Sequence, residues 1–352
     1  MFRFLSGLGG ILLAVSLLVS PANAEVNFAG KTVRILINFG VGSSTDVMTR
    51  QFAPFVGQYL PGNPTVIVEA KPGGRGTLGT AYMYKNVKPD GMTLGGLTII
   101  VARMATAKVP VDITKFVQVG ARGGAAVVYV RKDSGIKTAS DLKSVSQKVI
   151  MGATTPRSPS VMQIRLFLNA FGQDKHKLIA GYKGQLGMLK AVRSGEVQMA
   201  FMNNGQWMAR RDGFTKEGLV HGIMESGQND ASGKVVGSGV KLPTVDATWR
   251  KLLPDTIGSD GYKAFSFIQQ TRALNYLYVL PPKTPVDYAK AWDKAMASAI
   301  KDPGYLALLD KNSAPHPAWT NRDTTTKTLK QIAAKKNDPA IKAMIKKISG
   351  KK

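Results

Sequence analysis

Two short segments combine glycine with side chains that suit an anion, and each separates a β-branched run from a run with helical periodicity. The first reads Phe39-Gly40-Val41-Gly42-Ser43-Ser44-Thr45-Asp46. Gly40 and Gly42 permit a tight turn, and Ser43, Ser44 and Thr45 supply hydroxyls. The helix that follows leaves its first N–H groups unpaired, and its dipole favours an anion there, so a substrate carboxylate is a natural occupant. The same residues also fit an ordinary helix start, with Ser44 or Thr45 as the cap and Asp46 in the first turn.

The second segment contains a GxGxxG pattern. It reads Lys71-Pro72-Gly73-Gly74-Arg75-Gly76-Thr77-Leu78-Gly79. This is the position of a dinucleotide fingerprint, so a nicotinamide-dependent enzyme is one alternative. Pro72 and Gly73 lengthen the turn, however, and no acidic residue follows about twenty positions later to bind a ribose. We therefore interpret Gly74, Arg75, Gly76 and Thr77 as a second glycine-lined helix start that faces the first loop.

Three later segments offer polar groups that a ligand could contact from the other side. Thr154 and Ser158 lie between a predicted strand and a predicted helix, where they either bind a ligand or cap the helix. Tyr182 follows a strand and either packs or faces a cleft, and Asn203 ends a strand, where its amide could contact a ligand. Trp207 either stacks on an aromatic acid or packs in the core.

Composition excludes several kinds of chemistry. The 352 residues include no cysteine, which rules out thiol catalysis, zinc–thiolate sites, iron–sulfur clusters and disulfides. The three histidines, His176, His221 and His316, form no local metal motif. No G-x-S-x-G or H-E-x-x-H pattern occurs, although a Ser–His–Asp triad assembled from distant residues is not excluded by sequence. We expect no catalysis, no cofactor and no metal.

The elements that position these segments follow an α/β order. Apolar, β-branched runs predict strands at 31–39, 65–69 and 93–101, and helical periodicity predicts helices at 44–60 and 77–87. This order predicts a parallel sheet with both glycine loops at its carboxyl edge. A second set follows, with strands at 127–130, 148–151, 178–180 and 197–202 and helices from 139, at 160–171 and at 185–194. Residues 229–241 read as a surface loop, and 286–300 and 302–309 as helices. Two α/β sets indicate two lobes.

The two ends of the chain carry separate signals. Arg3, the apolar run 11–19 and the sequence Pro21-Ala22-Asn23-Ala24 predict a signal peptide over 1–24, cleaved before Glu25; the alternative is an uncleaved membrane anchor. Export without cysteine is typical of a bacterial periplasm. The formal net charge is +26, and the densest basic segment is 327–352. Its pattern predicts an amphipathic helix with a solvated face, while a polyanion- or membrane-surface-binding protein driven by this tail is the alternative.

Taken together, the motifs resemble the extracytoplasmic solute receptors of tripartite tricarboxylate transporters, the Bug-type receptors. The pattern Phe-x-Pro-Gly-Gly-x-x-Asp is similar to 39–46, and Arg-Pro-Gly-Ala-Gly-Gly is similar to 71–76. The likeness continues across most of 31–310, at Pro89-Asp90-Gly91-Met92-Thr93-Leu94, Tyr182-Lys183-Gly184, Gly195-Glu196-Val197, 281–285 and Asp302-Pro303. The chain departs from the pattern at Val41, Ser43 and Arg75, where Arg75 replaces a usual glycine. Arg75 then either takes a positive φ at a cost or reshapes the loop, and it either clamps a carboxylate or is exposed.

The resemblance implies a type II periplasmic-binding-protein fold with a ligand cleft between two α/β lobes. Residues 25–125 plus 225–352 would form a discontinuous lobe 1, and residues 126–224 would form lobe 2. The protein would be a periplasmic receptor. We expect it to be a monomer and to bind no nucleic acid. It would capture a small carboxylate (a dicarboxylate, tricarboxylate, amino acid or aromatic acid) by cleft closure and deliver it to membrane transporter subunits.

Overall fold

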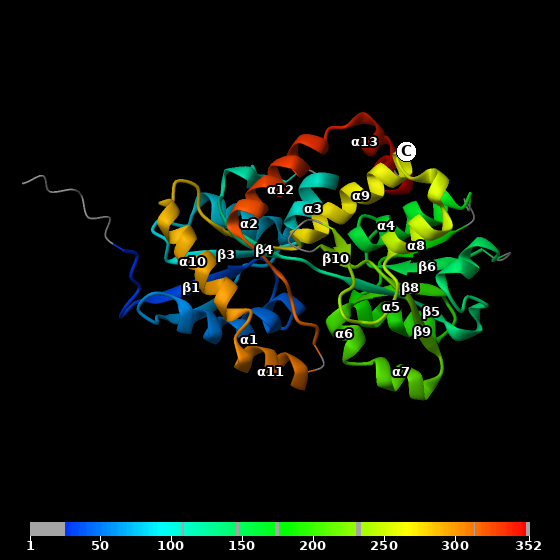
Figure 1. Ribbon diagram of the computed structural model, residues 1–352, viewed down its shortest axis with the longest axis horizontal. Coiled ribbons are helices and arrows are strands. Elements are labelled where there is room, and N and C mark those ends of the chain that lie inside the picture. Colours follow the sequence, from blue (N-terminus) through cyan, green and yellow to red (C-terminus); the bar gives the residue numbers. More distant parts are fainter. Residues whose placement is uncertain are drawn as a thin grey trace, which may run out of the picture.

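The computed structural model describes residues 25–107, 109–145, 148–172, 176–229, 234–312 and 314–349. The predicted signal peptide, residues 1–24, lies outside the described residues. Figure 1 shows an elongated molecule with one sheet in each half and helices around both sheets. The predicted α/β fold with two lobes is confirmed.

The first lobe is built on a six-stranded sheet with helices on both faces. In spatial order, its strands are β13 (Trp319–Thr320), β4 (Val117–Arg122), β12 (Tyr276–Leu280), β3 (Thr93–Thr98), β1 (Thr32–Ile37) and β2 (Thr65–Ala70). β1 pairs in parallel with both β2 and β3, as the β-α-β-α-β order predicts, whereas β12 is antiparallel to β3 and β4. One face carries α1 (Ser44–Tyr59) and α10 (Val286–Ala299), and the other carries α2 (Thr77–Lys85) and α12 (Arg322–Lys335).

The second lobe is built on a five-stranded sheet. Its strands, in spatial order, are β7 (Lys177–Ala180), β6 (Ile150–Ala153), β8 (Met199–Asn203), β5 (Ala126–Arg131) and β9 (Val220–Glu225). In Figure 1, helices α4, α8 and α9 lie above this sheet and α6 and α7 below it. The helices of this half are α4 (Pro159–Ala170), α5 (Gly184–Arg193), α6 (Asn204–Met208), α7 (Arg211–Glu217), α8 (Val245–Leu252) and α9 (Asp260–Ala273).

Some elements differ from the sequence prediction. The strand expected at 93–101 ends at Thr98, and α3 (Ile100–Thr106) follows it. The helix expected from residue 139 is a short 3-10 turn, Ala139–Lys143. The expected loop 229–241 contributes to a small hairpin of β10 (Gln228–Asn229) and β11 (Val235–Val236). The predicted helices near 286–300 and 302–309 correspond to α10 and α11 (Pro303–Lys311).

The chain crosses between the sheets at two neighbouring places. It leaves the first sheet after β4 through Gly123-Gly124-Ala125 and returns just before β12. The two crossings touch, since the Gly124 N–H donates to the Arg272 carbonyl (3.1 Å) and the Arg272 Nη2 donates to the Gly124 carbonyl (2.8 Å). A pair of adjacent crossings is the geometry of a hinge.

The helices just before the return pack on the second lobe. α8 and α9 contact α4, although they fall in the segment 225–352 that the sequence analysis places in lobe 1. We therefore propose that the second lobe extends beyond residue 224 to the end of α9 at Ala273, and that only the later residues rejoin the first lobe.

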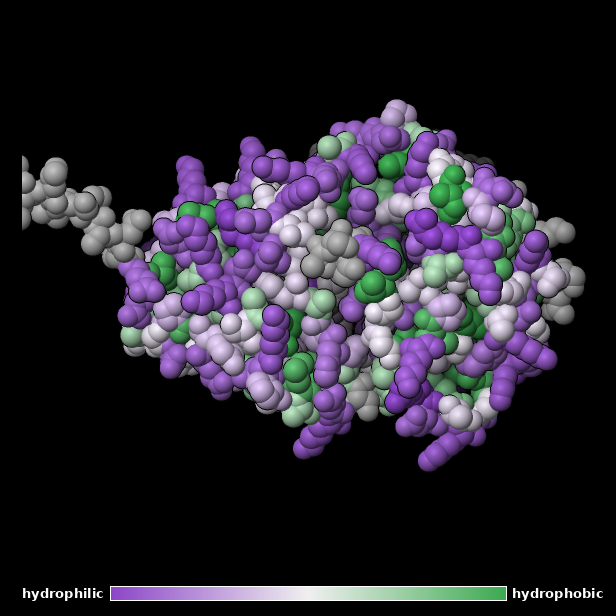
Figure 2. Space-filling model, in the orientation of Figure 1, coloured by the Kyte–Doolittle hydropathy of each residue, from purple (hydrophilic) through white to green (hydrophobic). Residues whose placement is uncertain are grey.

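The basic C-terminal segment forms two amphipathic helices. α12 and α13 (Pro339–Ser349) are separated by Lys336, Asn337 and Asp338, since Pro339 cannot continue a helix from the preceding turn. Leu329, Ile332, Ile341, Ile345 and Ile348 are buried. α12 contacts β4 and α3, while α13 contacts α9 and α4. The prediction of an amphipathic tail is confirmed, as two helices in place of one, and Figure 2 shows hydrophilic residues along its outer side.

Two hydrophobic clusters fill the molecule. One lies on the α1 and α10 face of the first sheet and includes Phe52, Trp292 and Tyr305. The other begins on the α2 and α3 face of the same sheet, at residues such as Met83 and Ile100, and continues into the core of the second lobe at Phe167 and Trp207. The two lobes therefore share one apolar core beneath α9, α12 and α13.

Searches within the described residues give two further results. None of their helices has the length and hydrophobicity that a membrane span requires. The same residues contain no cluster of histidine and acidic side chains that could hold a metal ion.

Candidate functional site

Asn38 joins three loops at the carboxyl edge of the first sheet. It follows β1 and is fully buried. Its Nδ2 donates to the carbonyls of Gly76 (3.3 Å) and Thr98 (3.1 Å), and its Oδ1 accepts from the Thr98 N–H (2.9 Å). A buried amide with these partners fixes the loops after β1, β2 and β3 relative to one another. The sequence analysis missed Asn38, although a lone amide at the end of the apolar run 31–39 was the available signal.

The loop after β1 holds its own helix start. Ser43 caps α1, since its Oγ accepts from the Asp46 N–H (3.2 Å). The expectation that Ser44 or Thr45 caps this helix is wrong, because Thr45 is buried and bonds the Thr98 hydroxyl (3.1 Å), and Ser44 is exposed. Asp46 is also buried, and its carboxylate accepts from the Gly42 N–H (3.0 Å) and from Arg50 Nε (2.8 Å). Asp46 thus shapes the loop, and its charge is balanced by Arg50.

Two N–H groups at this helix start remain available. Neither the Ser44 nor the Thr45 N–H bonds to any residue that the structure describes. They lie in the first turn of a 16-residue helix, where the helix dipole favours a negative charge. The predicted anion site at this loop is compatible with the cap, because the cap uses a different N–H.

The loop after β2 lies against the first loop. A Cβ on Gly40 would lie 3.8 Å from Pro72 Cβ, and a Cβ on Gly76 would lie 3.2 Å from the Phe39 ring. Gly76 takes φ 90°, and its Cβ would meet Asn38 Nδ2 at 2.6 Å. A Cβ on Gly79 would lie 2.4 Å from the Lys71 carbonyl oxygen. The GxGxxG glycines therefore serve contacts within the protein, and no cofactor is needed to explain them.

Arg75 takes the first of its two predicted backbone alternatives. Its φ is 56° and its ψ 44°, a left-handed conformation that costs an L-residue about 1–2 kcal/mol. Ile99, which joins β3 to α3, also has a positive φ, 55°. For a β-branched residue this is an outlier, and such strain concentrates at functional sites. Both strained residues lie in loops at the carboxyl edge that Asn38 organises.

Arg103 lies within electrostatic range of two other arginines, one from each lobe. Arg75 lies in the loop after β2, Arg103 on α3 and Arg157 in the loop between β6 and α4. Partial burial lowers the pKa of Arg103, and the positive charges of Arg75 and Arg157 lower it further. The Arg103 Nε is buried and has no hydrogen-bond partner in the described chain. No acidic residue of the described ranges forms an ion pair with any of the three.

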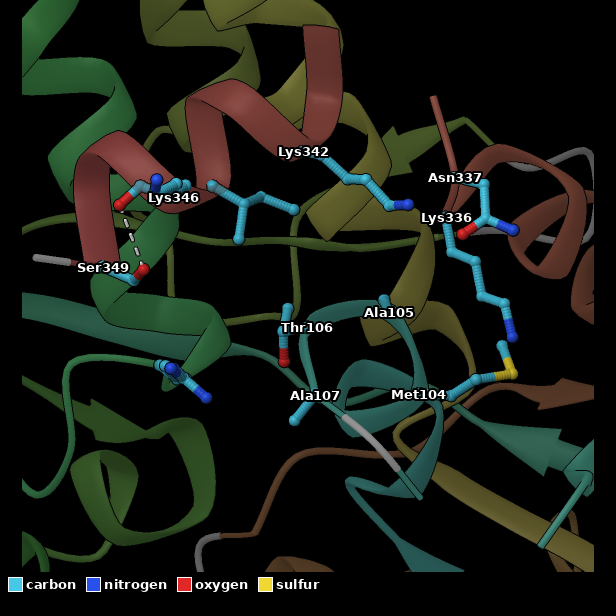
Figure 3. Close-up of a pocket in the computed structure, with 11 residues that line it drawn as sticks. Met104, Ala105, Thr106, Ala107, Lys336, Asn337, Lys342, Lys346 and Ser349 are labelled. Atoms are coloured by element: carbon cyan, nitrogen blue, oxygen red, sulfur yellow. Dashed lines mark hydrogen bonds between the residues drawn. The ribbon is translucent and has the colours of Figure 1, made fainter. Parts of the chain in front are cut away.

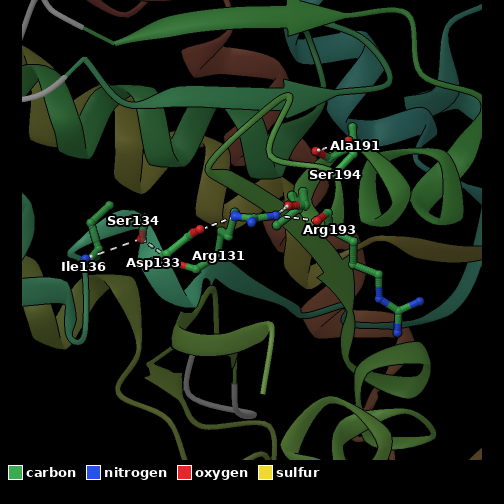
Figure 4. Close-up of polar contacts among 8 residues, drawn as sticks. Arg131, Asp133, Ser134, Ile136, Ala191, Arg193 and Ser194 are labelled. Atoms are coloured by element: carbon green, nitrogen blue, oxygen red, sulfur yellow. Dashed lines mark hydrogen bonds and ion pairs between the residues drawn. The ribbon is translucent and has the colours of Figure 1, made fainter. Parts of the chain in front are cut away.

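Arg131, in contrast to Arg103, has a structural role. It ends β5, and its Nε donates to Asp133 (2.6 Å), while its Nη1 donates to the carbonyls of Val192 (3.3 Å) and Arg193 at the end of α5 (Figure 4). A cation there complements the helix dipole. Arg131 is thus satisfied by the fold, in contrast to Arg103, whose buried Nε has no partner among the described residues.

The predicted residues of the second lobe divide into two groups. Thr154 and Ser158 lie in the same loop as Arg157, and both are half-buried. Ser158 is the N-cap residue of α4, but its hydroxyl makes no capping bond, so the role of an ordinary cap does not explain it. These two residues flank Arg157 in the sequence.

The other second-lobe residues have partners of their own. The Tyr182 hydroxyl donates to Glu196 (2.6 Å), and the ring lies against Gly152, so the side chain turns back along the sheet. Asn203 caps α6 through the Gln206 N–H (2.9 Å), which leaves its Nδ2 for other partners. Trp207 stacks on Tyr129 and contacts Phe214, so packing explains it. Contact of any predicted site residue with a ligand stays a prediction.

Solved structures share this architecture. A TctC solute-binding protein from Polaromonas, without ligand, superposes with a TM-score of 0.64 at 16% identity, covering 91% of this chain and 100% of the other. The chain has the fold of the periplasmic solute-binding proteins. The periplasmic binding protein BugD gives 0.59 at 17% identity, covering 90% and 97%, and R. palustris Rpa4515 with adipate gives 0.60 at 16% identity, covering 91% and 97%. No protein-family model matches the sequence, and no curated protein sequence matches it.

These neighbours confirm the fold that the resemblance to tripartite tricarboxylate receptors implies. The loops that carry the candidate residues belong to both halves of the molecule, and Figure 2 shows the surface indented between these halves.

Proposed function

We propose that this periplasmic-binding-protein fold serves as an extracytoplasmic receptor that binds a small carboxylate between its lobes. The supporting observation is Arg103, whose buried Nε has no partner in the described residues and which feels the positive charges of Arg75 in the first lobe and Arg157 in the second. Like charges held together raise each other's energy, and an anion between them lowers it. Guanidinium groups also match carboxylates in a two-pronged geometry. A ligand with more than one carboxylate suits the site best.

The first lobe would bind the ligand before the second one does. Asn38 holds the three first-lobe loops in place, and the free Ser44 and Thr45 N–H groups supply donors for a carboxylate. We place that carboxylate between the loops 43–46 and 73–77. Arg157, Thr154 and Ser158 would reach it from the second lobe when the two crossings flex.

The role of a receptor also explains what the site lacks. A receptor holds its ligand and releases it unchanged, so its site needs donors and charge but no nucleophile or general base. We propose that the protein catalyses nothing and delivers its ligand to tripartite tricarboxylate-type membrane subunits from the periplasm. The adipate-bound neighbour supports a carboxylate ligand. The alternatives of a nicotinamide enzyme and of a surface-binding basic protein gain no support from these comparisons.

Calorimetric titration with adipate, citrate, glutamate and benzoate tests the proposal. We expect one-to-one binding of at least one acid that carries two or more carboxylates. Arg103→Gln and Arg157→Gln should each weaken binding about tenfold or more, which is about 1.4 kcal/mol. Arg211→Gln, which removes an exposed cation of α7, is the matched control and should leave the affinity unchanged. Absence of heat with every acid would contradict the proposal.

A further inference from the structure

A hollow of about 360 Å³ lies beside the proposed carboxylate site and shares Arg157 with it, at the place where three parts of the chain meet. Its walls are the end of α3, the loop before α4 and the junction of α12 with α13, as Figure 3 shows. The first two come from different lobes, and the third is the C-terminal segment that packs across both. The GxGxxG loop and the N-terminus of α1 do not line it.

The polar wall of this hollow is basic. Arg157, Lys336, Lys342 and Lys346 line it, and none of its lining residues is acidic. Lys342 and Lys346 are one helical turn apart on α13, so both side chains project from the same face of the helix. No acidic residue of the described ranges forms an ion pair with any of the four.

The nearest acidic groups balance only part of this charge. The pKa of Asp112 is lowered chiefly by its hydrogen bonds with Thr114, and the charge of Lys336 contributes at longer range. Asp338 accepts from the Ile341 N–H (3.0 Å) at the start of α13. Lys342 follows Asp338 by one helical turn but forms no ion pair with it, and neither Lys346 nor Arg157 has an ion-pair partner within the described residues.

We infer that this hollow binds a small oxyanion with two or more negative charges, of phosphate or polycarboxylate chemistry. A monovalent ion would leave most of the positive charge uncompensated, whereas a multivalent oxyanion offers several acceptors to several cations at once. The rest of the wall is small or apolar, with Ala105, Ala107, Met104 and Ile345, which suits a compact ligand. The occupant contacts α3 of the first lobe, Arg157 of the second lobe and α13, and so stabilises this arrangement of the lobes.

This site differs from diffuse attraction to a basic surface. The tail also carries Lys330 and Lys347, which are exposed and do not line the hollow. A second hollow, of about 440 Å³, also includes Ser349 in its lining, together with Lys148, Arg165 and Lys177. These residues supply matched controls of equal charge at nearby positions.

The test is titration of the full mature chain with inorganic pyrophosphate, followed by calorimetry in the presence of saturating adipate. Adipate occupies the proposed carboxylate site and engages the shared Arg157, so pyrophosphate binding that persists depends on Lys336, Lys342 and Lys346, which line only the hollow. Failure of that proposal and failure of this one are therefore distinguishable. We expect one pyrophosphate per chain and a higher unfolding temperature. Citrate in place of pyrophosphate distinguishes polycarboxylate from phosphate chemistry, and acetate, with one charge, should give no saturable binding.

Lys342→Ala with Lys346→Ala should weaken pyrophosphate or citrate binding at least tenfold. Lys330→Ala with Lys347→Ala removes the same charge and should change the affinity less than twofold. All four lysines are exposed on helices, and circular dichroism of each variant checks the fold. Equal losses in the two double variants would reveal diffuse attraction and overturn the inference. If only the Lys148→Ala, Lys177→Ala double variant loses affinity, the anion binds in the second hollow and the inference is overturned. Absence of saturable binding of both pyrophosphate and citrate would also overturn the inference.

Discussion

At the scale of single residues, the site depends on side chains that serve other residues first. The Asn38 amide forms hydrogen bonds with the backbone of two neighbouring loops, and the Asp46 carboxylate accepts hydrogen bonds from Gly42 and Arg50. Thr45 bonds Thr98. The groups that remain available to a ligand are therefore those without such hydrogen bonds. They are the Ser44 hydroxyl, the N–H groups of Ser44 and Thr45, and the side chains of Arg75, Arg103 and Arg157.

Asn38→Ala should destabilise the protein. The substitution leaves the Thr98 N–H and carbonyl without their buried partner, whereas the Gly76 carbonyl keeps its bond from the Thr80 hydroxyl. Each unpaired group costs about 1–3 kcal/mol, so we expect a loss of about 2–6 kcal/mol in the free energy of unfolding. Urea denaturation measures it. Asn86→Ala, at an exposed position after α2, is the control. A loss no larger than in the control would show that Asn38 does not hold the loops.

Arg75→Gly should raise stability and lower affinity together. Glycine adopts the left-handed backbone of residue 75 without strain, and after the greater flexibility of unfolded glycine is subtracted the gain is about 0.5–1 kcal/mol. The lost cation weakens adipate binding, which calorimetry measures. Arg75→Asn, which also tolerates a positive φ but is uncharged, should lose the same affinity. Retained affinity in both variants would show that Arg75 is simply an exposed loop residue.

The sequence indicated the right loops but not all the right residues. Three successive hydroxyls, Ser43, Ser44 and Thr45, each suit a helix cap, and only the exact backbone position of the first turn decides among them. Arg103 was out of reach because its helix was not predicted. Residues 97–101 run through Ile99 without glycine or proline, so the turn there leaves no sequence signal.

At the scale of elements, periodicity found the three parallel strands of the first sheet and the β5 and β8 strands of the second, and it missed β4 and β12. β1, β2 and β3 alternate with helices, which is a local pattern. β12 pairs with β3 and β4 across long stretches of chain, and nothing in residues 276–280 specifies those partners. The split of the tail into α12 and α13 was foreseeable from Pro339, whereas its packing on both lobes was not.

One element, the segment after β9, is held by a buried acid. Glu225 lies at the end of β9 and is 1% exposed. Its carboxylate accepts from the Ser238 N–H (3.1 Å) and from the Ser238 hydroxyl. Burial raises the pKa of Glu225, and the bonds from Ser238 oppose that rise.

This acid should give stability a pH dependence of defined sign. Because its pKa is higher in the folded state than in the unfolded state, the folded protein binds more protons between the two values. The contribution of Glu225 to the free energy of unfolding therefore falls as pH rises from the ordinary carboxyl range through its folded pKa, and is constant above it. Urea denaturation of the wild type and of Glu225→Gln between pH 4 and 8 measures the difference. A pH-independent difference would contradict the assignment.

At the scale of the whole molecule, the two lobes are linked by more than the hinge. The shared apolar core extends from Ile100 beside the first sheet to Phe167 and Trp207 in the second lobe. Two lobes were predictable from two α/β sets in the chain. A common core was not, because it depends on how α9, α12 and α13 pack, and amphipathic periodicity alone does not identify a helix's partner.

A shared core predicts a single cooperative unfolding transition. Trp207 lies in the second lobe and Trp292 in the first, so variants that keep only one of them, with the other tryptophans replaced by phenylalanine, report each lobe by fluorescence. Within each variant, we expect the unfolding midpoint measured by fluorescence to coincide with the midpoint measured by circular dichroism. Comparing the two probes within one variant removes the effect of the substitutions on its stability. Separate fluorescence and circular-dichroism transitions within one variant would show that the lobes unfold independently.

The position of β12 has a consequence for how the chain matures. β12 lies between β3 and β4 in the first sheet, yet it is made after the whole of the second lobe. Until residues 276–280 emerge from the ribosome, β3 and β4 have no strand to join them, and the last helices are absent. The first sheet thus stays open between β3 and β4 until late in synthesis, and the first lobe closes only after the chain of the second one has been made.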